Sequence, residues 1–356
     1  MKIKSLLIGS AALMTVSTGS YAADAVVMAE PEPVEYVRVC DVYGAGFFYI
    51  PGTETCLRIG GYVRYEMAFS NAFGIPGAPS GWGSRARFAP VFDARTETEW
   101  GTIKAFAELE IGWTSNFIGS GVAGPVGGGM EALNLPQAYI EVQGASGTLR
   151  LGHGHRPYAR FLGYGSGNVF GGVYGYAERN EISYTFNGGN GFTAVIAAVE
   201  DNGFNWMPDL EGGINFRQGW GSVGAIVGYD ESANTWGAKG VLRLSSGALS
   251  GGLHVFYSSG AGSYAIIDPV TATVANWSVL GHAKYQFTPT VAATASVQWF
   301  NVPGTTWDIV GGLDITPFGA KEVGPAATLR IRPEIRYSTN AAGSVWGAAL
   351  RFDRNF

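Results

Sequence analysis

Charged side chains are scarce in this sequence. Aspartate, glutamate, lysine and arginine make up 14% of its 356 residues, whereas about 25% is typical of soluble globular domains. A chain with so few charges needs an apolar environment over part of its surface. Its formal net charge of −5 is mildly acidic and argues against nucleic acid as a partner, because nucleic-acid binding depends on clustered lysine and arginine.

Long hydrophobic runs are missing as well. After the N-terminus, no stretch reaches the roughly 18 consecutive apolar residues that indicate a transmembrane helix. Residues that favour helices are scarce, whereas glycine (54 residues) and aromatic residues (13%) are abundant. This composition favours strands and turns, so we expect an all-β protein.

The N-terminus has the pattern of an export signal. Lys2 and Lys4 precede a short apolar run from Leu6 to Val16, and Ser20-Tyr21-Ala22 fits a small-x-small cleavage site. The apolar run is too short to span a membrane. We therefore expect export and cleavage before Ala23.

Cysteine is nearly absent, and only Cys40 and Cys56 occur. An exported chain meets an oxidising compartment, so we expect these two residues to form a disulfide. A metal site is the weaker alternative, because two thiols without a nearby histidine fall short of the four ligands that zinc takes.

From residue 57 onwards, apolar and polar side chains alternate with a period of two, which is typical of half-buried strands. In the first run Leu57, Ile59 and Val63 share one face, while Arg58 and Arg64 share the other. We count about sixteen such runs, separated by connections that tend to alternate between short and long. The runs lie near residues 56–69, 84–99, 102–113, 134–143, 148–155, 180–187, 191–200, 209–218, 221–230, 235–245, 250–258, 276–287, 290–301, 306–316, 326–338 and 344–356.

An even number of short alternating segments, with short turns on one side and long loops on the other, is typical of an outer-membrane barrel. In lipid every backbone donor and acceptor must be paired within the protein, so the sheet has to close on itself. At sixteen strands the interior is too wide for side chains to fill and leaves an aqueous channel. A soluble β-sandwich or propeller is the alternative, but no repeat of 40 to 50 residues supports a propeller.

The sequence thus predicts a transmembrane antiparallel β-barrel of 16 strands in the bacterial outer membrane. We expect residues 1–22 to form a signal peptide, 23–55 a linker with a disulfide-tethered segment, and 56–356 the barrel. The expected partners are the lipid bilayer and lipopolysaccharide. Aromatic residues near strand ends fit the interfacial girdles of such barrels: Trp82, Trp100, Trp113, Tyr139, Trp220, Trp236, Trp277 and Trp346.

One long connection, Arg156 to Arg179, is rich in both glycine and aromatic residues. Loops of this length are usually functional or disordered, and disordered segments are poor in aromatics. We expect it to fold into the barrel mouth, pack on the inner wall and set the width of the hole. An ordinary surface loop is the alternative. The candidate constriction residues are Arg156, Tyr158, Arg160, Phe161, Tyr164, Phe170, Tyr174, Tyr176 and Glu178.

A basic wall is expected opposite this loop, because the first three and the last two strands are neighbours in a closed barrel. Its candidate residues are Arg58, Arg64, Arg85, Arg87, Lys104, Arg330, Arg332, Arg336 and Arg351. The alternative is that these cations are paired in salt bridges with Glu66, Asp93, Glu97, Glu108, Glu110, Glu334 and Asp353. Within the loop, Arg156 and Arg160 add positive charge against the single carboxylate of Glu178, which predicts weak ion selectivity or a preference for anions.

Catalytic and metal-binding patterns are weak. His153 and His155 share one strand face at a spacing that can bind metal, but no third ligand is evident. No clustered nucleophile, histidine and acid can be recognised, so we expect neither an enzyme nor a cofactor.

Several motifs resemble those of the alphaproteobacterial general porins. They are TETCLRIGGYVRYE from residue 53, the turn RTETEWGT, the segment ERNEISYTF, the terminal Phe356 and the cysteine-containing block YVRVCDVYGAGFFYIPGTETC. The resemblance covers essentially the whole chain.

The resemblance implies a sixteen-stranded homotrimeric porin for passive diffusion of small hydrophilic solutes and ions. Its third external loop, here Arg156 to Arg179, would fold into the lumen, and an external loop such as Thr114 to Leu133 would latch the trimer. Phe356 would be the C-terminal assembly signal, although Arg354 departs from the apolar residue that is usual there. A substrate-specific channel of the sugar type and a surface-binding protein without a channel are the alternatives.

Overall fold

The computed structural model describes residues 37–70, 81–115, 118–119, 122–123, 129–165, 169–201, 203, 205–318, 329–341 and 343–356. The predicted signal peptide and the first part of the predicted linker lie outside these residues. In the part that is described, neither helix has the length and apolar character needed to cross a membrane.

The described chain consists mostly of antiparallel strands, and its main sheet contains 18 of them. Two members are two-residue strands, β1 (Phe48–Tyr49) and β7 (Gly129–Met130). The sixteen long strands are β2 (Cys56–Ser70), β3 (Gly81–Thr98), β4 (Gly101–Ser115), β8 (Asn134–Gly144), β9 (Gly147–His155), β10 (Glu178–Gly189), β11 (Phe192–Val199), β12 (Asp209–Gln218), β13 (Gly221–Asp230), β14 (Thr235–Ser246), β15 (Leu249–Ser258), β18 (Trp277–Thr288), β19 (Val291–Phe300), β20 (Thr306–Ile315), β21 (Leu329–Asn340) and β22 (Gly343–Asn355). Two separate hairpins are formed by β5 (Ile118–Gly119) with β6 (Val122–Ala123), and by β16 (Ile266–Ile267) with β17 (Val274–Ala275).

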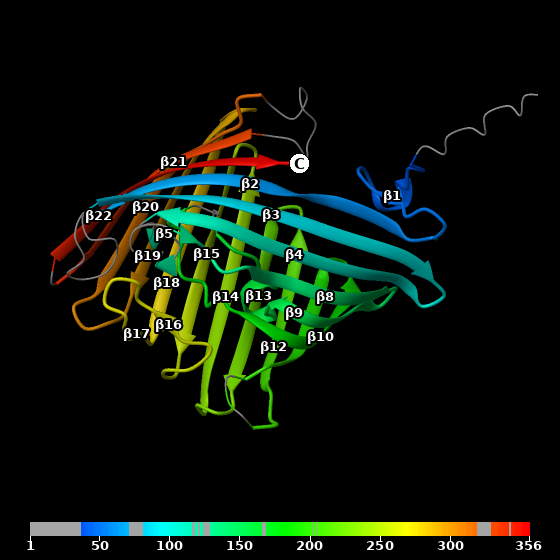
Figure 1. The fold of residues 1–356 in the computed structure, drawn as a ribbon. Coiled ribbons are helices and arrows are strands. Elements are labelled where there is room, and N and C mark those ends of the chain that lie inside the picture. The colour runs from blue at the N-terminus through cyan, green and yellow to red at the C-terminus, as the bar shows by residue number, and fades with distance from the viewer. Residues whose placement is uncertain are drawn as a thin grey trace, which may run out of the picture. The chain divides into compact units, whose positions relative to one another are not determined.

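The sheet closes between its first and last long strands. β2 pairs with β22 in antiparallel register from Tyr62 opposite Asn355 to Ser70 opposite Gly347. Figure 1 shows β2 and β22 side by side, with β3 and β4 following on the other side of β2. The prediction of a closed 16-stranded antiparallel barrel is therefore confirmed.

The two faces of the strands differ in polarity. On β20, Trp307 and Ile309 are exposed, whereas Asp308 between them is buried. On β2, Val63 and Tyr65 are exposed and Glu66 is buried. Apolar side chains that point outward and charged side chains that point inward are the reverse of a soluble protein, and they suit a barrel surrounded by lipid.

One expected member of the aromatic girdle points the other way. Tyr139 on β8 lies inside the barrel, where its hydroxyl accepts a hydrogen bond from Nζ of Lys104 at 3.1 Å. The guanidinium of Arg150 lies 3.5 Å from the centre of its ring. The expectation for Tyr139 was wrong because alternation along β8 places it on the polar face with Gln137 and Glu141, while the neighbouring positions face outward.

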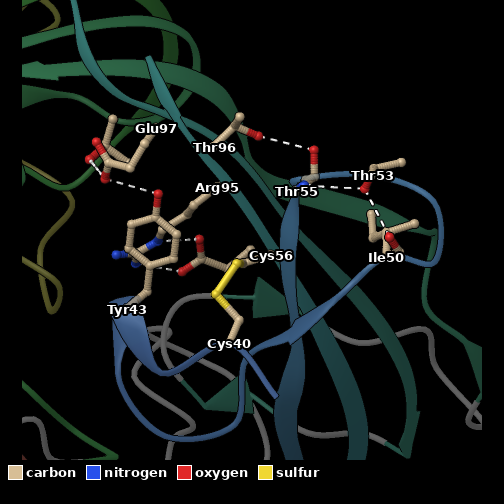
Figure 2. Close-up of a disulfide and its surroundings, with 11 residues drawn as sticks. Cys40, Tyr43, Ile50, Thr53, Thr55, Cys56, Arg95, Thr96 and Glu97 are labelled. Carbon is tan, nitrogen blue, oxygen red and sulfur yellow. Dashed lines mark hydrogen bonds and ion pairs between the residues drawn. A yellow bond between two sulfur atoms is a disulfide. The ribbon is translucent and has the colours of Figure 1, made fainter. Parts of the chain in front are cut away.

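The segment before the barrel is tied to the start of β2. Cys40 and Cys56 form a disulfide, as predicted (Figure 2), and Phe47 is buried in the same cluster. The turn η1 (Asp41–Tyr43) brings the hydroxyl of Tyr43 to within 2.9 Å of Oε1 of Glu97, to which it donates a hydrogen bond. Burial, followed by this carboxylate, raises the pKa of Tyr43 to about 12.

Candidate pore site

The connection between β9 and β10, residues 156–177, is hereafter the inner loop. It opens with one helical turn, α1 (Pro157–Arg160), which suits proline because its missing N–H would be unpaired at that position anyway. Gly163 follows with a φ of +73°, and its N–H donates to the carbonyl oxygen of Arg160. Glycine adopts this conformation without strain, so the turn can end and the chain can change direction.

Tyr158 is the first anchor of the inner loop. Its ring is fully buried against Val195, Ile226 and Val241, which lie on the inner faces of β11, β13 and β14. Its N–H donates to Oε2 of Glu211 on β12 at 2.5 Å. Burial of the phenol raises the pKa of Tyr158 well above its ordinary value, so the side chain stays neutral.

Arg156 and Gly175 join the two ends of the inner loop. Nη2 of Arg156 donates to the carbonyl oxygens of Gly175, at 3.1 Å, and Ser263. The φ of Gly175 is +67°, and a Cβ there would meet the Tyr158 ring at 2.8 Å, so the position requires glycine. Arg156 is buried and its Nε lies 3.8 Å from the carboxylate of Glu211, so its charge is compensated within the wall.

The middle of the inner loop reaches the far wall of the barrel. The N–H groups of Val169 and Phe170 both donate to the carboxylate of Glu334 on β21, at 2.8 and 3.1 Å. Val169 packs against Ala68 and Ala349, which are buried positions on β2 and β22.

The loop then returns along β19 and β18. Gln298 on β19 accepts from the N–H of Val173 at 2.7 Å and donates to its carbonyl oxygen at 3.0 Å. Tyr174 packs against Phe256 and Leu280 on the inner faces of β15 and β18. Burial raises the pKa of Tyr174, which therefore also stays neutral.

These contacts fix the path of the inner loop. A single short segment touches inward-facing side chains on β12, β14, β19 and β21, which are spread over eight consecutive long strands of the sixteen. Only a segment inside a closed barrel can do so. The loop therefore crosses the interior, in agreement with the predicted inward fold.

A second connection, residues 259–276 between β15 and β18, folds against the inner loop. The ring of Tyr264 lies 5.1 Å from that of Tyr158, edge to face. Both Tyr264 and Ile266 are buried. The sequence marked this connection only as a long one. Its apolar content, half of the residues 259–276, is as high as that of the inner loop and is the signal that could have identified it.

The exposed side of the inner loop is held by a chain of hydrogen bonds at His155, the last residue of β9. The hydroxyl of Tyr164 lies 2.8 Å from Nδ1 of His155, and that of Tyr176 lies 2.9 Å from Nε2. Tyr176 donates in turn to the carboxylate of Glu178. Tyr176 therefore accepts the Nε2–H of His155, and Nδ1 accepts from Tyr164. His153 instead pairs with Asn180, at 3.1 Å.

The remaining loop residues of the prediction take structural positions. Arg160 reaches Glu181 at 2.6 Å and Ser183 at 3.0 Å on β10. Phe161 is half-buried against the cluster that contains Tyr158. Phe170 is half-buried and lies 5.9 Å from the guanidinium of Arg336.

Each of the nine expected wall cations has a carboxylate partner. The pairs are Arg58–Asp93, Arg64–Asp353, Arg85–Glu131, Arg87–Glu110, Lys104–Glu141, Arg330–Asp314, Arg332–Asp314, Arg336–Asp308 and Arg351–Glu66. The wall is thus charged but largely compensated. Four of the partners, Glu66, Asp93, Glu110 and Asp353, are among those that the salt-bridge alternative named, whereas Glu131, Glu141, Asp308 and Asp314 are not. Only Arg58 and Arg330 among the nine keep more than a third of the side chain exposed, at 43% and 39%.

The C-terminal residue, Phe356, contacts β2 and β3 of the barrel wall. The N–H of Phe356 donates to the carbonyl oxygen of Gly61 at 3.1 Å, and its ring stacks on that of Phe88, with centroids 6.1 Å apart. Nine of the twenty residues of the predicted trimer-latching loop, Thr114 to Leu133, lie outside the described residues, namely 116–117, 120–121 and 124–128.

Comparison with known proteins identifies the family. Residues 24–344 match the profile of a family described as the porin subfamily. The chain is 38% identical to Porin Omp2b of Brucella canis and of Brucella abortus, over the full length of both proteins. The chain belongs to this porin family. It is an outer-membrane protein, and the resemblance read from its sequence motifs is confirmed.

Solved structures share the fold of this porin at low sequence identity. The outer membrane channel DcaP of Acinetobacter baumannii superposes with a TM-score of 0.60 at 13% identity, covering 86% of the porin and 99% of DcaP. OmpT of Vibrio cholerae gives 0.60 at 11% identity, with the same coverage of 86% and 99%. A triple mutant of the Rhodopseudomonas blastica porin gives 0.51 at 17% identity, covering 83% and 99%.

Proposed function

We propose that this porin is a passive channel for small hydrophilic solutes and ions, and that its inner loop sets the narrowest cross-section. One observation carries the proposal. The inner loop is fixed at both walls, by Glu211 and Lys239 on one side and by Glu334 on the other. A loop anchored in this way narrows the interior permanently, while the side of the ring that it leaves uncovered remains open to water.

The open side is bordered by paired charges and by exposed loop phenols. Glu110 on β4 accepts from the hydroxyl of Tyr62 at 2.9 Å and pairs with Arg87. Glu108 on the same strand accepts a hydrogen bond from Nε2 of Gln137 at 2.8 Å. Two unit charges about 4 Å apart interact by only ~1–4 kcal/mol between bulk-water and surface dielectrics. Such a wall biases the flux of ions without trapping them.

Compensation of the wall cations supports weak ion selectivity. Arg156 is buried against Glu211, and Arg160 pairs with Glu181, which it shares with Arg150, so each loop arginine has a carboxylate beside it. The arrangement carries no catalytic step, and the proposal assigns the chain no enzymatic activity or cofactor.

We further propose a homotrimer in contact with lipid and lipopolysaccharide. The outer face of β3, β4 and β8 carries small side chains, including Ala94, Ala105 and Ala138, around a shallow apolar groove of about 380 Å³. Small residues let protein surfaces approach closely in a membrane, where van der Waals packing drives association. Residues 1–22 are proposed to be removed on export, with 23–55 as the linker to the barrel at 56–356.

Planar-bilayer recording of the purified mature protein tests the channel. We expect stepwise conductance increments and a small reversal potential in a KCl gradient. Absence of conductance from correctly folded protein overturns the proposed channel. The proposed trimer is tested by the molecular mass in mild detergent, and a mass that corresponds to one chain overturns it.

A substrate-specific channel is the second candidate, because Tyr176 is 52% exposed beside Tyr164 and offers a stacking face to a sugar ring. Liposome swelling distinguishes the two candidates. Uptake rates that depend on solute size alone support general diffusion, and saturable uptake of one sugar supports the specific channel.

A further inference from the structure

A second segment of the chain lies inside the barrel beside the inner loop. It is the connection between β15 and β18, hereafter the 259–276 connection. The N–H of Ser263 donates to Oδ2 of Asp230 on β13 at 2.6 Å, and Asp268 accepts from the hydroxyl of Thr306 on β20 at 2.7 Å. Asp230, Asp268 and Thr306 are all buried. The 259–276 connection is therefore fixed to inward positions on two strands that have four other long strands between them.

Tyr264 of this connection fits into a gap that two glycines leave in the inner wall. Gly228 on β13 and Gly237 on β14 lie directly opposite each other in the antiparallel register. A Cβ on Gly228 would lie 2.1 Å from Cε1 of Tyr264, and a Cβ on Gly237 would lie 2.7 Å from its Cβ. Glycine within a strand often marks such a close approach. Tyr264 is only 1% exposed, so its ring does not itself border the open part of the interior.

Both ends of the inner loop contact the 259–276 connection. At the first end, Nη2 of Arg156 donates to the carbonyl oxygen of Ser263, and the guanidinium lies 4.3 Å from the centre of the Tyr264 ring. At the second end, Ile266 is packed in the buried cluster that contains Tyr174. The connection thus covers residues near the start and near the end of the inner loop.

Displacement of the 259–276 connection would expose the start of the inner loop to water. Arg156 and Tyr158 are 1% and 0% exposed, and the ring of Tyr264 contacts both. Without that cover, water would compete for the hydrogen-bond donors of Arg156, and part of the apolar surface of Tyr158 would be hydrated. The docked position of the inner loop would therefore become less favourable relative to an undocked one.

We propose that the 259–276 connection holds the inner loop in its inward position, and that Tyr264 is the positioning residue of this contact. The width of the pore then depends on a buried side chain that does not touch the passing solute. The inference rests on the proposed channel function, and it adds a second segment to the parts of the chain that set the narrowest cross-section.

Single-channel recording of the full mature protein in KCl tests the role of Tyr264. In Tyr264→Ala we expect brief excursions to a larger current to become about tenfold more frequent than in the wild type, because the aromatic contact and the burial that it provides are lost. Tyr264→Phe keeps the ring in the gap and should retain the wild-type frequency. Because Tyr264 is buried, it changes the current only through the inner loop, and a merely structural role would lower heat stability without adding excursions.

Gly228→Ala changes the same contact from the side of the wall. Its methyl group would occupy the place of the Tyr264 ring, so this variant should show the same excursions. In the double variant Gly228→Ala/Tyr264→Ala the ring is absent, and we expect no further increase over Tyr264→Ala alone. Gly240→Ala is the matched control, because it adds a methyl group to β14 where no heavy atom beyond its chain neighbours lies within 4 Å. It should behave as the wild type.

The outcomes separate this inference from the channel function. A wild type that does not conduct overturns the channel, and this inference with it. A conducting wild type whose record is matched by Tyr264→Ala and Gly228→Ala overturns the positioning role alone. So does a double variant in which the effects of the two substitutions add. If Tyr264→Ala does not fold, the comparison of Gly228→Ala with Gly240→Ala decides.

Discussion

Nζ of Lys239 lies 2.5 Å from the carbonyl oxygen of Tyr158, so β14 holds the inner loop by a buried hydrogen bond. The rings of Tyr158 and Phe256 lie 4.7 and 5.7 Å from the same nitrogen. Lysine is rarely buried to this degree. Here its donors satisfy a loop carbonyl that would otherwise have no partner at the turn of α1.

Lys239→Met should loosen the inner loop while preserving the volume of the side chain. A buried carbonyl group without a hydrogen-bond partner costs about 1–3 kcal/mol. This cost destabilises the docked position of the inner loop relative to an undocked one. We expect larger and noisier single-channel currents in KCl. Lys284→Met loses the same charge without touching the loop, and it should not enlarge the current. Equal behaviour of the two variants would contradict the anchoring role of Lys239.

Glu334→Gln should release the far side of the inner loop. The carboxylate accepts from two N–H groups, those of Val169 and Phe170, whereas an amide turns an NH₂ group toward one of them. The free energy that holds the inner loop in its docked position should fall by about 1–3 kcal/mol. We expect the single-channel current to flicker and the channel to close at a lower voltage than in the wild type. Glu54→Gln, an exposed change of the same chemistry in the segment before the barrel, serves as control.

Much of this architecture could be predicted from the sequence. The two-residue alternation located the sixteen long strands, because inward positions that face water favour polar residues and outward positions that face lipid favour apolar residues. Inward positions covered by the inner loop, such as Val195 and Ile226, are apolar instead. Tyr139 was assigned to the girdle because it is aromatic, although its place between Gln137 and Glu141 indicated the inner face. The alternation of polar and apolar positions along the strand would have placed Tyr139 correctly, whereas its aromatic character did not.

The anchors of the inner loop could not be predicted in the same way. Lys239 and Gln298 are polar residues at inward positions, like many others, and their partners are distant in sequence. Glu334 was interpreted only as a salt-bridge partner for the wall. Which inward side chains meet the loop depends on its path through the barrel, and no local pattern encodes that path.

Arg160→Glu should move the ion preference toward cations. The guanidinium of Arg160 pairs with Glu181 at 2.6 Å, so the substitution replaces a compensated pair by two neighbouring carboxylates. We expect a small reversal potential for the wild type in a KCl gradient and a shift toward K⁺ for the variant. Arg160→Gln should give about half of that shift, since it changes the charge by half as much. A wild type that already strongly prefers K⁺ would refute the expected weak selectivity.

Removal of the disulfide should free the segment before the barrel and leave the barrel intact. Cys40 and Cys56 are separated by 16 positions, and a closed loop of this size contributes about 3 kcal/mol in the chain-entropy model. In the double variant Cys40→Ser/Cys56→Ser, chymotrypsin should cut near Phe47, which is buried in the native cluster. Resistance equal to that of the wild type would show that packing alone holds the segment.

The pairing of β2 with β22 has a consequence for biogenesis. The first long strand finds its second neighbour only in β22, the 13 residues Gly343–Asn355, which is the last strand to be synthesised. Until those residues have emerged, both borders of the growing sheet are unsatisfied, and no intermediate can enter lipid as a smaller ring. Premature termination a few codons from the end should therefore yield a polypeptide destined for degradation, not a leakier pore.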